Sequence, residues 1–139
     1  MISCVFPRWS LQVCLHLFRR LTRYPHLLLG YVFSGADDIA PFLEEPIVGP
    51  TSIFCAELSK RLRCYVAAGY PERLSSDEQR KPVLSGALDD AGNPVQQVGA
   101  NSAVLYGPDG SLVGNYRKTN PFETDMTWAK PGKVLRFMA

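Results

Sequence analysis

The 139-residue sequence predicts an α/β fold, and three observations carry that prediction. Glycine and proline together make up 22 residues, about 16% of the chain, which favours a turn-rich fold over a helical bundle. Residues 51–62 carry apolar side chains at helical spacing. Residues 101–116 form two β-prone runs around a turn sequence, which predicts a β-hairpin.

Residues 1–29 are predicted to be a basic segment in front of a domain at residues 30–139. Residues 1–36 contain four arginines and no acid, a charge of +4, whereas the remainder of the chain carries −2. A basic head without acids can indicate mitochondrial targeting, and the alternatives are an ill-defined start to the domain or an incorrectly predicted first exon. A secretory signal fits less well, because Gln12 and His16 interrupt the only candidate apolar core. No apolar run is long enough to span a bilayer, so we expect no membrane partner.

The cysteines predict an intracellular protein with reduced thiols. None of the four is spaced as CxxC, and only two histidines could join them in a zinc site, so we expect no metal and no cofactor. Reduced thiols favour the cytoplasm, with the mitochondrion as the alternative. The net charge of +2 gives no reason to expect a nucleic-acid partner. The four cysteines and two histidines considered for a zinc site are Cys4, Cys14, Cys55, Cys64, His16 and His26.

Residues 30–62 predict a loop followed by the first long helix. Residues 30–35 indicate a loop after a buried strand, and residues 37–46 a loop with at most a short helix. The helix is expected to start near residues 49–52, with Thr51 or Ser52 as its cap and Pro50 in its first turn. Its apolar side consists of Phe54, Cys55, Leu58 and Leu62, so Cys55 is expected to be a packed, inert thiol.

A short buried strand is predicted next, at residues 64–68, with a loop from Gly69 to Glu72. Residues 73–94 are polar and predict a surface excursion that contains a turn. In the hairpin that follows, the turn is Gly107-Pro108-Asp109-Gly110, whose residue types suit its backbone angles. Because residues 103–106 are apolar without alternation, we expect the first hairpin strand to be covered on both faces. The second strand leads to Arg117 and Lys118 at its end.

This order of segments resembles the nitrilase (carbon–nitrogen hydrolase) superfamily. The resemblance rests on Gly69-Tyr70-Pro71-Glu72-Arg73, the hairpin, Tyr116-Arg117-Lys118-Thr119, Trp128 and Pro131-Gly132. Asn101-Ser102-Ala103 and Glu123-Thr124-Asp125 look most like the fungal branch of protein N-terminal amidases. The resemblance implies the N-terminal half of an α-β-β-α sandwich. It also implies an amide substrate, a cofactor-free reaction and a homodimer.

By this resemblance Lys118 is the catalytic lysine. In the family a cysteine thiolate attacks an amide or nitrile carbon, and the lysine ammonium stabilises the negative charge that develops. A glutamate transfers the protons. Glu123 or Asp125 is then an additional acid near the lysine, and an exposed loop carboxylate is the alternative for either. Glu72 matches a family position but is expected to be structural.

Two other parts of the family triad have no clear counterpart in this sequence. His26 lies nearest the position of the general-base glutamate and could act as a base, and loss of that segment to an incorrect upstream exon is the alternative. No cysteine follows Lys118, which lies 21 residues before Ala139. We therefore expect this chain alone to be inactive. The alternatives for its function are a small-molecule amidase or nitrilase of the same superfamily, or a truncated, non-catalytic binding protein.

Overall fold

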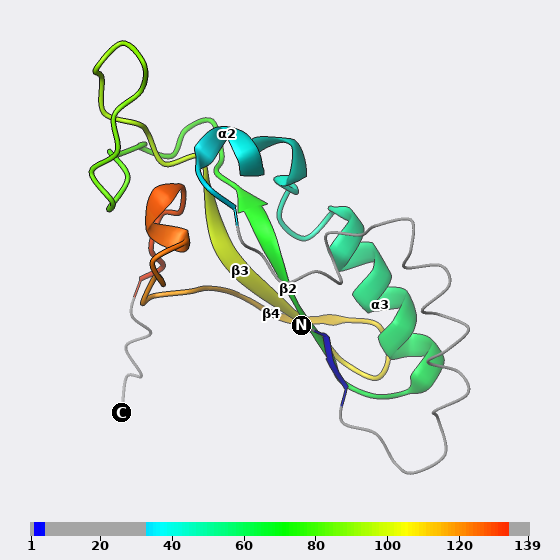
Figure 1. The fold of residues 1–139 in the computed structure, drawn as a ribbon. Helices are drawn as coiled ribbons and strands as arrows, with labels where there is room; N and C mark the ends of the chain where they lie inside the picture. Colours follow the sequence, from blue (N-terminus) through cyan, green and yellow to red (C-terminus); the bar gives the residue numbers. More distant parts are fainter. Residues whose placement is uncertain (1, 5–32, 134–139) are drawn as a thin grey trace.

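A four-stranded antiparallel sheet forms the centre of the computed structural model, which describes residues 2–4 and 33–133 (Figure 1). Its strands lie in the order β1 (Ile2–Cys4), β2 (Val66–Arg73), β3 (Gly99–Tyr106) and β4 (Leu112–Arg117). The helical elements are α2 (Ala36–Ile39), η2 (Ala40–Phe42), α3 (Pro50–Leu62) and η3 (Asp125–Thr127). The predicted α/β fold is confirmed, with one helix layer and one sheet as in the N-terminal half of an α-β-β-α sandwich.

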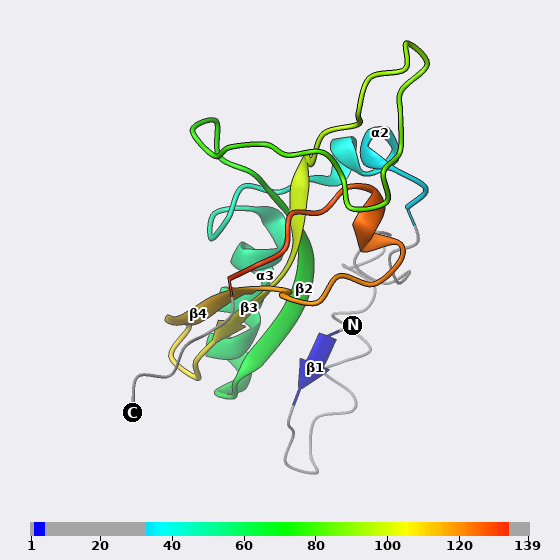
Figure 2. The same cartoon turned by 90° about the vertical axis from the view of Figure 1, so that its left-hand side faces the viewer.

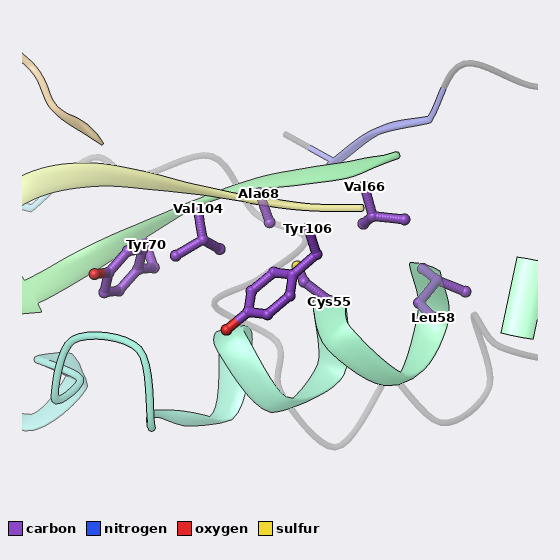
Figure 3. Packing of buried hydrophobic residues seen from close by; sticks show 7 residues of the cluster. All are labelled: Cys55, Leu58, Val66, Ala68, Tyr70, Val104 and Tyr106. Atoms are coloured by element: carbon purple, nitrogen blue, oxygen red, sulfur yellow. The ribbon is translucent and has the colours of Figure 1, made fainter. Parts of the chain in front are cut away.

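Helix α3 packs on one face of β2 and β3 (Figure 3). Cys55 and Leu58 of α3 are buried, as predicted for the apolar side of this helix. They meet side chains that alternate along the two strands and therefore share one face. These are Val66, Ala68 and Tyr70 of β2 with Val104 and Tyr106 of β3. Because α3 covers this face of the sheet, the alternate residues of β2 and β3 face away from α3.

The start of α3 differs from the prediction in its cap. Gly49 occupies the N-cap position and Pro50 lies in the first turn, so Thr51 is already inside the helix. The carboxylate of Glu44 caps it instead, accepting the Thr51 amide at 2.8 Å and the Thr51 hydroxyl at 2.7 Å. The expectation that Thr51 or Ser52 caps α3 was therefore wrong, because a residue from the preceding loop satisfies the free amide.

Strand β2 continues through the segment that was predicted to be a loop. Pro71 does not end it, because the Pro71 carbonyl accepts the Glu44 amide at 2.8 Å on the edge away from β3. The missing N–H of Pro71 points to the same side, so the ladder to β3 loses no hydrogen bond. The amide of Arg73 then donates to the Glu44 carbonyl at 2.8 Å. Gly69 to Glu72 are strand residues, and that prediction was wrong.

The hairpin of β3 and β4 has the predicted turn. The Gly110 amide donates to the Gly107 carbonyl at 2.9 Å, and Gly110 adopts a φ of +81°, which glycine tolerates without strain. The Asp109 carboxylate accepts the Ser111 amide at 3.0 Å. The expectation that β3 is covered on both faces was wrong for the described residues. Leu105 is only half-buried, because α3 packs on the opposite face.

Residues 74–98 form the predicted polar surface excursion between β2 and β3 (Figures 1 and 2). A second apolar cluster joins the α2 region to the segment after η3. The buried members of this cluster are Ala36, Ile39, Leu43, Trp128 and Ala129. Within residues 2–4 and 33–133, no helix is long and apolar enough to cross a membrane.

Candidate active site

Lys118 follows directly after β4, and its backbone is fixed on both sides. Its amide donates to the Asn101 carbonyl of β3 at 2.8 Å, and its carbonyl accepts the Gly132 amide at 2.9 Å. A side chain at Gly132 would collide with the backbone of Arg117, so only glycine permits this approach. The Lys118 side chain is 39% exposed, and its ammonium lies 2.7 Å from the carboxylate of Asp125.

Asp125 is a buried carboxylate that binds three donors. One oxygen accepts the Lys118 ammonium at 2.7 Å and the Phe122 amide at 2.9 Å. The other oxygen accepts the Asn101 side-chain amide at 2.9 Å. Burial by itself raises the pKa of Asp125, but the hydrogen bonds from these three donors outweigh it and hold the pKa below its usual value. Asp125 is therefore a carboxylate at neutral pH.

Element η3 and the residue after it hold Asp125 in place. The Asp125 carbonyl accepts the amides of Trp128 at 3.2 Å and Ala129 at 2.7 Å. Trp128 is 3% exposed and belongs to the second apolar cluster. Its carbonyl accepts the Val98 amide at 3.0 Å, which fastens the segment to the residue directly before β3. The Trp128 of the sequence motif is thus an anchor for the loop that carries Asp125.

The structure separates the two acids that the sequence offered as alternatives. Asp125 lies against Lys118, whereas Glu123 is exposed in the same loop. His26, which lies nearest the position of the family's general base in the sequence, is outside the described residues.

A second network surrounds Arg117, the residue before Lys118. Glu72 is 2% exposed, and one of its carboxylate oxygens accepts hydrogen bonds from two guanidinium nitrogens of Arg117, at 3.0 and 2.7 Å. It also accepts the Ser102 hydroxyl at 2.6 Å and the Asn115 side-chain amide at 3.2 Å. Burial raises the pKa of Glu72, but these hydrogen bonds outweigh it and lower the pKa overall. Glu72 therefore ties β2, β3 and β4 together as an anion, within a strand and not in the loop that was predicted.

The two described cysteines with placed side chains lie away from this site. Cys55 is fully buried between α3 and the sheet, and Cys64 packs against the same cluster. Ser102 faces that side of β3, so the neighbouring Asn101 faces the other side, where Asp125 binds it. Cys55 and the Lys118 site are on opposite faces of the sheet. Among residues 33–133, no group of three or more His, Cys, Asp or Glu side chains could hold a metal ion.

Comparison with known proteins identifies the class to which this geometry belongs. The carbon–nitrogen hydrolase family profile matches residues 24–139, and the chain therefore belongs to the carbon–nitrogen hydrolase family. The resemblance seen in the sequence is confirmed. Within this family its relatives lie in the N-terminal amidase branch.

The relatives in that branch are much longer than this chain. The protein N-terminal amidase of Saccharomyces cerevisiae is 32% identical over 101 residues, which cover 73% of this chain and 18% of the yeast protein. The Schizosaccharomyces pombe protein N-terminal amidase is 32% identical over 121 residues, 85% of this chain and 36% of the relative. A crystal structure of N-terminal amidase with an Asn-Glu-Ala peptide has a TM-score of 0.53 and 30% identity, covering 75% of this chain and 20% of that chain.

The structure brings two residues to the site that the sequence did not indicate. Asn101 binds Asp125, and Glu78 adds a second carboxylate to Arg117 at 2.7 Å. Asn101 stood in a motif that was noticed for its resemblance alone. Glu78 lies in the polar excursion, where the sequence carries no signal that distinguishes it from Asp77 or Asp90.

Proposed function

We propose that this chain carries the lysine part of the active site of a thiol-dependent amidohydrolase. The observation that supports it is the ammonium of Lys118, half-exposed at the end of β4 and paired with buried Asp125 at 2.7 Å. A lysine that is merely solvated at a strand end needs no buried carboxylate as a partner. An ion pair between exposed side chains contributes little to stability. Here three donors converge on one acid that orients the ammonium.

In this proposal Lys118 stabilises the charge that forms during amide hydrolysis. A thiolate attacks the amide carbon, and the carbonyl oxygen becomes an oxyanion that the Lys118 ammonium binds. The C–N bond then breaks, ammonia leaves with a proton from the general base, and water hydrolyses the thioester to the acid. The thiol and the base are expected outside residues 33–133. Because no cysteine follows Lys118 in the 139-residue chain, we expect this chain alone to release no ammonia.

The proposed substrate is the side-chain amide of an N-terminal Asn or Gln. Support comes from the two yeast relatives, both named protein N-terminal amidase, and from an N-terminal amidase structure that contains an Asn-Glu-Ala peptide. Such a site acts on peptides or protein N-termini. A homodimer and a cytoplasmic location remain predictions from the family resemblance and the reduced cysteines.

Ammonia release from paired substrates tests this proposal. The longest natural form that contains residues 33–133 is incubated with an Asn-initiated peptide, the same peptide with an acetylated N-terminus, and free asparagine. We expect turnover of the first alone. Preference for free asparagine would instead favour the small-molecule amidase. Release of ammonia by the 139-residue chain would contradict the expectation that it lacks the nucleophile.

A further inference from the structure

One carboxylate from a loop distant in sequence binds the residues at both ends of the segment that carries Lys118 and Asp125. Residues 118–129 leave the sheet after Arg117 and return to it at Lys130. Both flanking cations bind Glu78, which belongs to the 74–98 excursion. Figures 1 and 2 show the excursion and η3 at the same end of the sheet.

The contacts of Glu78 are numerous for a residue in a surface loop. Its two oxygens accept two Arg117 nitrogens at 2.8 and 2.7 Å, and the Lys130 ammonium at 2.7 Å. The Glu78 side chain is 23% exposed, and those of Arg117 and Lys130 are each 26% exposed. Isolated surface ion pairs contribute little, but a two-nitrogen arginine contact within a half-buried network is stronger and geometrically specific.

Arg117 transmits the position of Glu78 to the site. Its guanidinium is held between Glu72 and Glu78, and the next residue along the chain is Lys118. Lys130 is fixed from the other end, where its amide donates to the Gly99 carbonyl at 2.8 Å. The Gly132 amide then reaches back to the Lys118 carbonyl at 2.9 Å. The two ends of residues 118–129 are therefore held together, partly by backbone and partly by Glu78.

We propose that Glu78 is a positioning residue, which sets the location of the Lys118 ammonium by bridging Arg117 and Lys130. Glu72 has a different task, because it is buried and joins three strands. Glu78 joins no strands, so its replacement removes the bridge and leaves the β2–β3–β4 ladder in place. The inference rests on the proposed function only in that Lys118 is the group to be positioned.

The test compares Glu78→Gln with Asp90→Asn in the 139-residue chain. Each variant removes one negative charge from the 74–98 excursion, but Asp90 is exposed and lies outside the network. Exchange of the Lys118 ammonium protons and the Gly132 amide proton is measured by NMR, with the Val104 amide of β3 as the internal reference. We expect exchange at Lys118 and Gly132 to be about 5-fold faster in Glu78→Gln, equivalent to losing one charge-assisted contact. Exchange at Val104 should accelerate less than at Lys118 and Gly132, because Val104 reports only the loss of global stability. Every probe in Asp90→Asn should remain as in the wild type.

Two outcomes would overturn the proposal. Unchanged exchange at Lys118 and Gly132 in Glu78→Gln would show that the bridge positions nothing. Equal acceleration at Val104 would show that Glu78 acts through global stability alone. If Glu78→Gln does not fold, Lys130→Gln removes the same bridge from its other end and must give the same selective acceleration. Glu78→Asp should restore part of the protection. None of these exchange measurements requires catalytic turnover. A failure of the proposed amidase activity can therefore be distinguished from a failure of the proposal for Glu78.

Discussion

Asp125 is the residue on which the geometry of the candidate site depends most directly. It gathers the Lys118 ammonium, the Phe122 amide and the Asn101 side chain on one buried carboxylate. Glu123, two residues earlier, has the same charge but is exposed. These two acids therefore form a natural pair for experiment, since the loop is the same and only the burial and partners differ.

Asp125→Ala is expected to destabilise the chain by about 1–3 kcal/mol, because its partly buried donors lose their acceptor. Glu123→Ala, as the matched control, should change the free energy of unfolding by no more than about 0.5 kcal/mol. Urea unfolding followed by far-UV circular dichroism measures both. Equal losses in the two variants would mean that Asp125 does not organise this loop.

At the scale of elements, α3 depends on Glu44 from the preceding loop. Thr51 donates its amide and its hydroxyl to this carboxylate, which is buried, whereas the neighbouring Glu45 makes an exposed ion pair with Arg73 at 3.1 Å. A carboxylate at a helix N-terminus satisfies a free amide and interacts favourably with the helix dipole. Two adjacent glutamates thus have unequal roles.

Glu44→Ala should lower the free energy of unfolding by about 0.5–2 kcal/mol, the range for loss of a helix cap. Glu45→Ala should lower it by less than about 1 kcal/mol, because an exposed ion pair contributes little. The measurement is the urea midpoint of each variant. A larger loss for Glu45→Ala than for Glu44→Ala would contradict the assignment of the cap.

The elements that the sequence predicted well are those with local causes. Helix α3 follows from its apolar spacing, and the hairpin follows from Gly107-Pro108-Asp109-Gly110. The cap of α3 and the extension of β2 through Pro71 were missed, because both depend on Glu44, a residue distant in sequence from the strand. Which way the Pro71 carbonyl points depends on strand register, and no local pattern encodes it.

The same reasoning applies to the candidate site. Lys118 was predicted from its sequence motif, and it lies directly after β4, at the predicted strand end. The choice between Glu123 and Asp125 stayed open in the sequence, since the two acids lie only two residues apart in the same loop. In the fold, η3 and the buried Trp128 place Asp125 against Asn101 and Lys118. Glu78 could not be found because its partners are 39 and 52 residues away.

Over the whole molecule, three paired carboxylates make stability depend on acid pH. The hydrogen bonds from Arg117, reinforced by Lys130, lower the pKa of Glu78 from 4.5 to about 2. In Glu72 and Asp125 burial raises the pKa, but their hydrogen bonds outweigh it and leave both below their usual values. A carboxyl whose pKa is lower in the folded state binds protons more readily when unfolded. Its stabilisation is full above its unfolded pKa and is lost as pH falls toward its folded pKa.

The urea midpoint should therefore be lower at pH 3 than at pH 7, with most of the decline between about pH 4.5 and pH 2. Glu78→Gln removes one of the three groups and should flatten this dependence. Identical midpoints at pH 7 and pH 3 would show that these carboxylates are not paired in the folded protein.

The central claim is that Lys118 supplies the charge-stabilising ammonium of an amide-hydrolysing site, and one measurement tests it most directly. The kcat/KM for ammonia release from an Asn-initiated peptide is compared between Lys118→Ala and Lys60→Ala, in the longest natural form that contains residues 33–133. Lys60 is exposed on α3 and serves as the control. We predict a loss of at least about 100-fold for Lys118→Ala, the scale for removing an oxyanion donor, and wild-type activity for Lys60→Ala. Activity within a few-fold of wild type in a folded Lys118→Ala variant would contradict the claim.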